Sequence, residues 1–456
     1  MKLPADPRRA LQCSRTAAAL IVVAMLVACA DGSGPVPTGS SGVGGDAGDG
    51  GASAQSTAAG QGAATSANGG AAPTGSGSGG ETASSAGQTE ELDALLARLR
   101  ADRDGTLVAE SLEGGWPVRV EGGRVVVSTD PGLSVVAGDF DDWAGTPLAV
   151  DEGFSWGILP DEPGARYKLK AGDAFATDPW SRAYGYDEFG EIPYVAPPGE
   201  AHLERWPVVS GGDLDTRTVR AWVPAAEATH VLYVHDGQNL FDPDAFNGGW
   251  HLQDVAPSAM LLIGIDNTSA RMDEYTHVAD DIGNGPIGGR GDAYAAYLTD
   301  VVRPLVDDRY GEPATIGTMG SSLGGLVSLH IALLDPDTYS FAASLSGTLG
   351  WGSIRGDNET IIERYESAGL QSIAIYLDSG GGGDSCEDAD GDGTSDDDPS
   401  AADNYCETIQ MRDALATGGW TFDVDLFHWW EPDATHDEAA WAARVDMPLA
   451  IFADVN

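Results

Sequence analysis

The alternation of apolar runs with helical patterns after residue 203 is the feature that most limits how this chain can fold. Strand-type runs such as "HVLYVHD", "AMLLIGID" and "SIAIYLD" are separated by longer helix-type segments such as "DAYAAYLTDVVRPLVDDRY". Apolar strands that alternate with helices are typical of βαβ units, in which helices cover both faces of a parallel sheet. We therefore predict an α/β domain with a mainly parallel sheet over residues 203–456.

The first 29 residues have the features of an export signal. An arginine-rich start is followed by an apolar stretch over residues 17–28 that is too short to span a bilayer. The stretch ends in "LVAC", which resembles the bacterial lipobox, and this likeness implies that Cys29 is diacylated. We therefore predict an exported lipoprotein, anchored by its lipid to the cell envelope at the outer membrane or cell surface. A plain signal peptide cut after Ala28 is the alternative.

Three segments of different character follow. Residues 30–88 are mostly Gly, Ala, Ser and Thr, which cannot build a core, so we predict a disordered linker. The leucines after it are spaced for one face of a helix, which predicts a short amphipathic helix over residues 89–103. Residues 107–198 change to short period-two apolar runs separated by Gly, Pro and Asp, which predicts a small β-sandwich.

The predicted sandwich resembles a known domain type. Its segments "VVAGDFDDWAG" and "YKLKAGDAFATDPW" are similar to the early-set, immunoglobulin-like domain that precedes the catalytic domain in glycogen-branching enzymes, with Asp141 in place of the usual Asn. Trp143, Trp156 and Trp180 could stack on sugar rings, or they could fill the core, which is the usual place of large aromatic residues in a small sandwich. The sequence leaves both roles open.

The charge of the chain excludes one class of partner. Asp and Glu number 71 against 24 Lys and Arg, so the net charge is −47. Such a surface repels phosphate backbones, and we expect no nucleic-acid partner. Contact with a membrane is expected only through the lipid anchor, and the sequence leaves the oligomeric state open.

A nucleophile motif lies in the predicted α/β domain. Residues 320–324 read "GSSLG" and match G-x-S-x-G, after the strand-type run "ATIGTM" and before a helical pattern. That context is the one a nucleophile elbow requires, because the glycines permit a sharp turn from strand to helix. The flanking glycines select Ser322, since Ser321 would be flanked by Met319 and Leu323 instead.

A serine nucleophile needs a base, and histidines at three positions follow it. His330 lies two turns along the same predicted helix, too far to fold back. His428 lies inside a strand-type run. His436 lies in the loop "EPDATHDEAAW" after that run, at the end of the strand where the base belongs. We therefore predict His436 as the base.

The third member of a triad is a carboxylate that orients the imidazole. It is expected in the loop after the strand "SIAIYLD", where several acidic residues crowd together. Asp378, Asp384, Glu387 and Asp388 are all candidates on this argument. The residues themselves do not choose among them.

A second resemblance covers residues 205–456, which are similar to the esterase branch of the α/β-hydrolases. That branch includes enterochelin esterases, feruloyl and acetylxylan esterases, and the antigen 85 mycolyltransferases. The matching segments are "LYVHDGQNLF", "ARMDEYT", "GSSLGGLVSLHIALLDPDTYSFAASLSG" and "HDEAAWAAR". The likeness implies an α/β-hydrolase sandwich and a serine esterase.

The same resemblance assigns further roles. It places the acid three residues after a Gly, which fits Gly381 and Asp384, with Asp378 as the second choice. It also implies an oxyanion hole formed by the backbone amides of Leu323 and Gln238. Arg271 and Glu274, in the segment "ARMDEYT", are expected to form a structural ion pair beside the pocket.

An acidic insertion follows the proposed acid. Asp388, Asp390, Asp392 and Asp396 stand at positions 1, 3, 5 and 9 of a calcium-type loop, with Gly393 at position 6. The loop lacks the usual Glu at position 12, where Pro399 stands, although Asp397 or Asp398 could substitute. We predict a structural calcium ion here, and a solvated acidic loop is the alternative.

Two cysteines flank this insertion. In an exported chain, Cys386 and Cys406 are expected to form a disulfide, and two free thiols are the alternative.

These features predict a secreted serine esterase that works through an acyl-enzyme and needs no cofactor for catalysis. By analogy, the early-set likeness favours glycan-linked esters, with a feruloyl or acetyl group. The alternatives are a siderophore-lactone esterase, an acyltransferase on the same triad, and a non-catalytic glycan-binding lipoprotein on a hydrolase scaffold.

Overall fold

The computed structural model describes residues 91–383, 385–397 and 403–455. The predicted signal peptide with Cys29, the predicted linker over residues 30–88, and Asp384 lie outside these ranges, so those assignments stay predictions. Within the described part of the chain, no helix combines the length and the apolar character that crossing a membrane requires.

Two consecutive helices open the described chain, α2 (Leu92–Ala101) and α3 (Arg103–Leu112). The helix predicted from the leucine spacing forms as α2, and Leu95, Leu96 and Leu99 are buried. Asp102 ends it and caps the next helix, because its side chain accepts a hydrogen bond of 3.0 Å from the Gly105 amide. The second helix was not predicted from the sequence.

Two antiparallel four-stranded sheets follow. The first consists of β1 (Val118–Val120), β2 (Gly123–Ser128), β6 (Phe154–Leu159) and β5 (Ala149–Asp151) in that order, and the second of β4 (Thr146–Pro147), β3 (Val135–Gly138), β7 (Tyr167–Ala171) and β8 (Ala174–Ala176). Val126 and Leu159 of the first sheet pack with Val136 and Leu169 of the second in one buried cluster. The region is therefore two-layered, and its early-set class stays a prediction.

The remaining chain is organised around a ten-stranded sheet. In spatial order its strands are β10 (Gly190–Pro193), β9 (Ala183–Asp187), β11 (His202–Gly211), β12 (Leu214–Val223), β14 (Met260–Ile265), β13 (His230–His235), β17 (Thr315–Ser321), β18 (Phe341–Leu345), β19 (Ala374–Ser379) and β20 (Leu426–Trp430). The first five strands pair antiparallel, and β14 to β20 pair parallel. The predicted mainly parallel sheet is present, extended by an antiparallel edge.

That antiparallel edge corrects a predicted boundary. Strands β9 and β10 lie within residues 107–198, the range predicted for the separate sandwich, yet β9 pairs with β11 through Leu203 and Tyr184. The Pro-rich segment "APPGEA", residues 196–201, therefore connects β10 to β11 within one sheet. A composition change marks a loop, but it does not show which sheet the flanking strands join.

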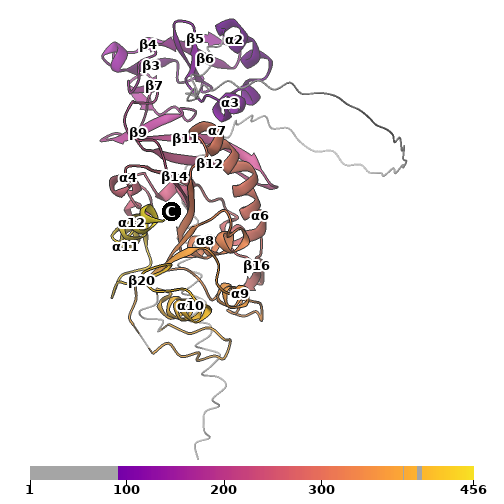
Figure 1. Ribbon diagram of the computed structural model, residues 1–456. Helices are drawn as coiled ribbons and strands as arrows, with labels where there is room; N and C mark the ends of the chain where they lie inside the picture. Colours follow the sequence, from indigo (N-terminus) through magenta and orange to yellow (C-terminus); the bar gives the residue numbers. More distant parts are fainter. Residues whose placement is uncertain (1–90, 384, 398–402, 456) are drawn as a thin grey trace, which may run out of the picture. The chain divides into compact units, whose positions relative to one another are not determined.

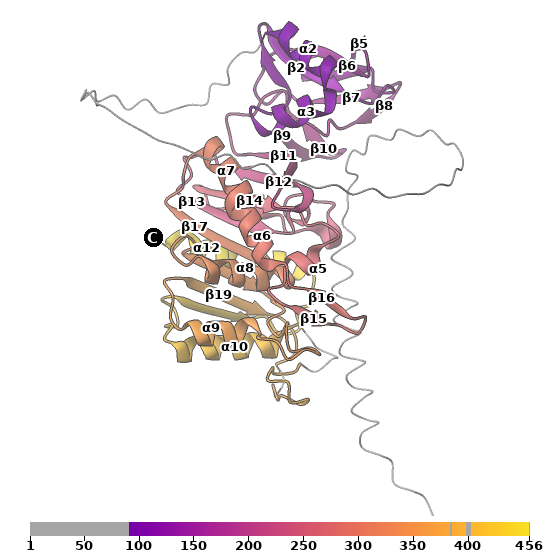
Figure 2. The ribbon, with the colours of Figure 1, turned by 90° about the vertical axis from the view of Figure 1, so that its right-hand side faces the viewer.

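Helices cover both faces of this sheet (Figures 1 and 2). One face carries α6 (Gly291–Tyr297), η4 (Leu298–Val302), α7 (Arg303–Tyr310), α8 (Leu323–Leu334), α9 (Ile361–Ala368) and α10 (Tyr405–Gly418), and the other carries α4 (Leu252–Val255), α11 (Glu438–Ala442) and α12 (Asp446–Asp454). Each face has its own buried apolar cluster. Runs such as Met260–Ile265 are buried at every residue, as strands covered on both sides must be.

The loops that matter for function leave the carboxyl ends of the parallel strands. β17, β18 and β19 end at Ser321, Leu345 and Ser379, and adjacent pairing brings these ends to one edge of the sheet. Binding sites in open α/β sheets lie at this edge.

The remaining short elements of the α/β part are η2 (Gly237–Asn239), η3 (Phe246–Gly248), α5 (Arg271–Glu274), and the hairpin of β15 (Ala279–Asp281) and β16 (Pro286–Gly288). The short element η1 (Asp139–Asp141) lies between the strands of the two small sheets.

Candidate active site

Ser322 lies in a strained turn between β17 and α8. Its φ of 56° and ψ of −125° are unusual for a residue with a side chain, and such strain gathers at functional sites. A Cβ on Gly320 would lie 2.6 Å from the backbone of Gly324, so the close approach needs glycine. The Ser322 amide donates to the Leu345 carbonyl at 2.9 Å, which fixes the turn to β18. This geometry is that of a nucleophile elbow.

His436 is bound to Asp403, a carboxylate that the sequence did not single out. The Nδ1 atom of His436 lies 2.6 Å from Oδ1 of Asp403, and both side chains are buried. Asp384, the preferred acid, lies outside the described residues. Asp378, the second choice, has Tyr376 and Arg444 as its partners instead. Because Nδ1 offers one hydrogen-bonding position, the orienting acid of His436 is Asp403.

Sequence reasoning missed Asp403 because the insertion displaces it from the end of β19. The resemblance places the acid three residues after Gly381, close to the end of β19. Asp403 instead stands just ahead of α10, at the far end of the insertion. A usable signal was present, since Asp403 is followed by Asn404 and by the first helical pattern after the insertion. Cys406 then ties this point back to Cys386.

Asp403 is held firmly on its second oxygen. Oδ2 accepts a hydrogen bond from the Ser346 hydroxyl at 2.8 Å and another from the Gly380 amide. Its neighbour Asn404 donates to the Ser346 carbonyl at 2.8 Å and lies 3.4 Å from the Thr348 hydroxyl. The hydroxyl of Thr348 lies in turn 3.4 Å from Oγ of Ser322. The loop after β18 thus links the nucleophile to the acid.

The loop that carries His436 is fixed from two sides. Asp437 caps α11 by accepting the Ala440 amide at 3.0 Å, and the ring of Trp441 lies edge-on, 5.0 Å from the His436 ring. Glu438 accepts hydrogen bonds from Asn239 at 3.2 Å and from Asn247 at 3.3 Å. Because Asn239 belongs to η2, the base is tied to the predicted oxyanion loop.

The two predicted oxyanion donors lie at turns. Leu323 is the first residue of α8, so its amide has no acceptor within the helix. Gln238 lies in η2, and its side chain accepts the Asn267 amide at 3.1 Å. A Cβ on Gly237 would lie 2.7 Å from the Gly264 backbone, which explains the glycine before Gln238. The oxyanion role of the two amides stays a prediction.

Asp236 fixes the oxyanion loop through Arg271. The guanidinium donates to both carboxylate oxygens at 2.8 Å, and Asn267 donates at 2.6 Å. Burial by itself would raise the pKa of Asp236, but Arg271 and Asn267 outweigh it and lower that pKa. The predicted pair of Arg271 with Glu274 is therefore wrong. Glu274 is bound instead by Arg217 on β12, at 2.7 and 2.9 Å, because each buried carboxylate takes its own guanidinium.

The other two histidines that follow Ser322 have lowered pKa values. His330 lies 2.9 Å from Asp292 and 2.8 Å from Arg364, and burial lowers its pKa to about 4. Burial also lowers the pKa of His428 to about 4. Both nitrogens of the His330 ring are engaged, and Nε2 of His428 is buried without a hydrogen-bond partner among the described residues, which is consistent with the choice of His436.

The aspartates of the acidic insertion accept hydrogen bonds from backbone amides of the same loop. The carboxylate oxygens of Asp388, Asp390 and Asp392 lie within 4.8 Å of one another, and Asp396 accepts the Ala389 amide at 2.8 Å. Burial raises the pKa of Asp392 and of Asp396, and the charge of Asp390 raises both further. Oxygen ligands this close suit a hard cation, so these carboxylates fit calcium, which stays a prediction. The predicted Cys386–Cys406 disulfide is confirmed.

The fold and the site together define a serine hydrolase of the α/β-hydrolase class. Residues 216–450 match the family described as Putative esterase, which is more than half of the chain. The chain belongs to this family of carboxylic ester hydrolases.

Individual relatives are more distant. The uncharacterized protein YbbA of Bacillus subtilis (strain 168) is 31% identical over 126 residues, which are 26% of this chain and 49% of YbbA, so the match spans about half of that relative. Among solved structures, an IroE-like serine hydrolase from Shewanella oneidensis is 19% identical, with a TM-score of 0.42 over 56% of this chain and 81% of that one. The enterobactin esterase FES from Shigella flexneri is 14% identical, with a TM-score of 0.40 over 72% and 92%.

The correction of the acid makes a direct prediction. Asp403→Asn should lower kcat roughly ten-thousandfold, because the amide no longer holds the imidazole in the right tautomer or stabilises its charge. Asp384→Asn should cost far less. Steady-state hydrolysis of p-nitrophenyl acetate measures both, with Asp433→Asn, an exposed acid in the His436 loop, as the matched control. A near wild-type kcat for Asp403→Asn would contradict the assignment.

The acidic insertion makes a second prediction. Calcium at 100 times its Kd should stabilise the folded protein by about 2.7 kcal/mol, and EGTA should remove that gain. Thermal unfolding with calcium and with EGTA measures the difference in Tm. The difference should vanish in Asp390→Asn and persist in Asp357→Asn, an exposed acid elsewhere. Calorimetric titration without binding up to millimolar calcium would leave only the solvated loop.

Proposed function

We propose that this protein hydrolyses carboxylic esters through a covalent acyl-enzyme on Ser322. The observation that carries the proposal is the 2.6 Å contact of His436 with Asp403, at the same sheet edge as a serine held in a nucleophile elbow. This arrangement supplies the nucleophile, the base and the orienting acid that such catalysis needs.

The hydrogen bond of His436 to Asp403 decides which ring nitrogen accepts the serine proton. Nδ1 of His436 is bound to Asp403, so Nε2 is the nitrogen that accepts the Ser322 proton. The serine oxygen attacks the ester carbonyl, and Nε2 returns the proton to the departing alcohol. Water then repeats both steps and releases the acid. The amides of Leu323 and Gln238 stabilise the negative oxygen, and one such donor contributes about 2.7–4 kcal/mol.

The proposed substrate is an ester on a neutral glycan, with a feruloyl or acetyl group. An edge-to-face pair of aromatic rings at the second small sheet, called the platform below, supports this proposal. The ring of Trp143 lies 5.9 Å from that of Phe175, which is 48% exposed, and Lys170 lies over Phe175 at 5.1 Å. Trp156 and Trp180 instead pack against the buried cluster of the first sheet. All three tryptophans are partly exposed, but Trp143 is not among the residues that pack against that cluster, which supports a role in binding for Trp143.

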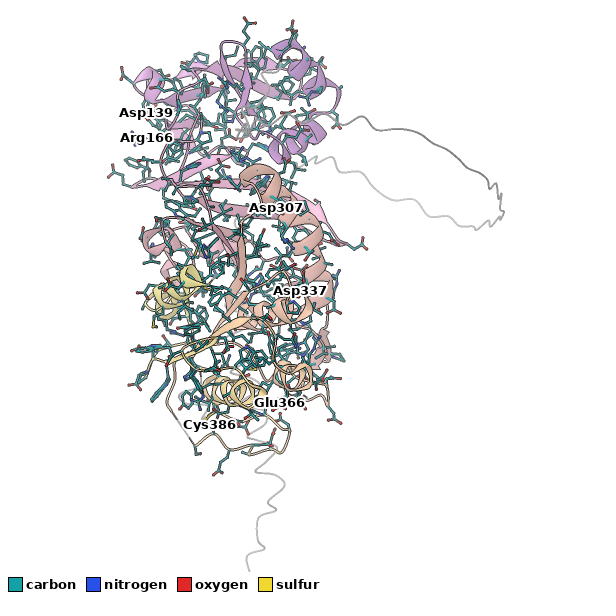
Figure 3. The ribbon with its side chains drawn as sticks, in the orientation of Figure 1. Asp139, Arg166, Asp307, Asp337, Glu366 and Cys386 are labelled. Carbon is teal, nitrogen blue, oxygen red and sulfur yellow. A yellow bond between two sulfur atoms is a disulfide. The ribbon has the colours of Figure 1, made fainter. Side chains whose placement is uncertain are left out.

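Polar groups beside the platform are held in fixed positions. Asp139 accepts the Trp143 indole N–H at 3.0 Å and pairs with Arg166 through two hydrogen bonds of 3.0 Å (Figure 3). A large aromatic face with oriented polar neighbours suits a sugar ring, which presents both apolar faces and hydroxyls. The net charge of −47 disfavours a polyanionic polymer, which is why a neutral glycan is proposed.

The nucleophile provides the test of ester hydrolysis. Ser322→Ala should lower kcat on the order of a millionfold, by comparison with other serine hydrolases, while Ser321→Ala should be mild. The assay uses p-nitrophenyl acetate, methyl ferulate, acetylated xylan and a catechol trilactone. Fastest turnover of the trilactone would favour a siderophore-lactone esterase. No turnover of any ester and no labelling by a fluorophosphonate probe would leave a binding protein.

The platform provides the test of the glycan. Trp143→Ala should lower the rate on acetylated xylan several-fold and leave the rate on p-nitrophenyl acetate unchanged, because only the polymer reaches the second sheet. Phe189→Ala, at an exposed aromatic residue outside the platform, is the control and should affect neither. Equal rates of Trp143→Ala and wild type on the polymer would refute the role of the platform.

A further inference from the structure

Two buried carboxylates share one guanidinium behind the triad. The exposed fractions of these residues are 0% for Asp378, 1% for Asp403 and 2% for Arg444. Nη2 of Arg444 lies 3.1 Å from Oδ1 of Asp378 and 3.7 Å from Oδ2 of Asp403. The same nitrogen donates to the Ser346 hydroxyl at 2.8 Å. Asp378 therefore belongs to the site although it does not contact His436.

The hydrogen bonds of Ser346 explain why Arg444 stays apart from Asp403. Its hydroxyl accepts from Arg444 and from the Trp441 indole at 3.1 Å, and it donates to Asp403 at 2.8 Å. A hydroxyl has one donor and two acceptor positions, so all three are used. The hydroxyl thus stands between the guanidinium and the catalytic acid, and the short ionic contact of Arg444 goes to Asp378.

The charges of this cluster do not balance in the resting protein. One guanidinium faces two carboxylates, which leaves one negative charge away from water. Burying an unbalanced charge is costly, and the cost falls only when a partner charge arrives. His436, in contact with Asp403, gains a positive charge when it takes the serine proton. The cluster is balanced in that state of the reaction.

We propose that Asp378 is a positioning residue that neutralises Arg444, so that Asp403 keeps its full negative charge for the imidazolium of His436. The inference rests on the proposed function of the triad and deepens it. Without the charge of Asp378, the guanidinium would act on Asp403 and His436 directly. The positive charge of Arg444 would then disfavour the protonated form of His436.

The groups around Asp378 give this role a pH dependence. Tyr376 on β19 donates to its other oxygen at 3.1 Å, Arg444 and Asp403 face it, and Asp446 on α12 faces Tyr376. Burial raises the pKa of Asp378 to about 6, against the opposing effects of Arg444 and Tyr376, and the charge of Asp403 raises it further. As the pH falls through about 6, Asp378 gains a proton and Arg444 loses its counter-charge. Activity should then fall on the acidic side, where one proton goes to Asp378 and the other to the base, His436.

The test is the titration of the His436 imidazole, followed by NMR in a Ser322→Ala background with labelled histidine and assigned by His436→Gln. Asp378→Asn, which removes the charge and keeps the shape, should move the midpoint to lower pH by about one unit, since an uncompensated guanidinium disfavours a nearby cation. In the enzyme with Ser322 intact, the same change should lower kcat roughly tenfold, with KM unchanged. Asp357→Asn, which removes the charge of an exposed acid elsewhere, is the control and should leave the midpoint in place.

A second variant keeps the proposal testable if Asp378→Asn folds poorly. Asp378→Asn with Arg444→Gln removes both charges, so the midpoint should return towards that of the parent. An unmoved midpoint in folded Asp378→Asn, with or without a loss of kcat, would show a purely structural role and overturn the proposal. Failure of the double variant to restore the midpoint would do the same.

The titration is read without turnover, so its outcome is separate from that of the proposed function. If the wild type hydrolysed no ester, the proposed function would fail while the midpoints could still be compared. If the wild type were active and the midpoint did not move, only the charge-balancing role of Asp378 would fail.

Discussion

The contact between His436 and Asp403 is the interaction on which the rest of the site depends. It joins the loop after β20 to the residue ahead of α10, and Asp403 in turn is held by Ser346 after β18 and Gly380 after β19. Strands that are neighbours in the sheet thus each contribute one point of support. Because both carboxylate oxygens of Asp403 and the hydroxyl of Ser346 are hydrogen-bonded, a shift of one loop would unpair a buried polar group, which costs free energy.

Buried arginines also hold loops and strands of the large sheet in place, each by pairing with a carboxylate. Arg271 fixes the oxyanion loop through Asp236, Arg217 satisfies Glu274, and Arg205 on β11 pairs with Glu191 on β10 at 2.8 Å. A planar guanidinium can satisfy both oxygens of a carboxylate, which makes each pair directional as well as attractive. In a chain with so few basic residues, several are therefore placed at the loops and strand joints that set the geometry of the site.

The insertion after β19 shows how a family scaffold can be altered without losing its chemistry. The acid is displaced to the far end of an acidic loop, and a disulfide brings that end back beside the sheet. The strand end itself carries another carboxylate, Asp378, which faces Arg444. The separation of the two carboxylates allows one to act on His436 and the other on the guanidinium.

The sequence by itself determined the features that depend on local pattern. The alternation of runs gave the α/β sheet, the flanking glycines selected Ser322, and the position of His436 after a strand-type run marked it as the base. Only the tertiary structure decided what depends on distance across the fold: that Asp403 is bound to His436, that Arg271 pairs with Asp236, and that β9 and β10 extend the large sheet. The physical reason is that hydrogen-bond partners are chosen by proximity and burial in space. Spacing along the chain predicts that proximity only where no insertion intervenes.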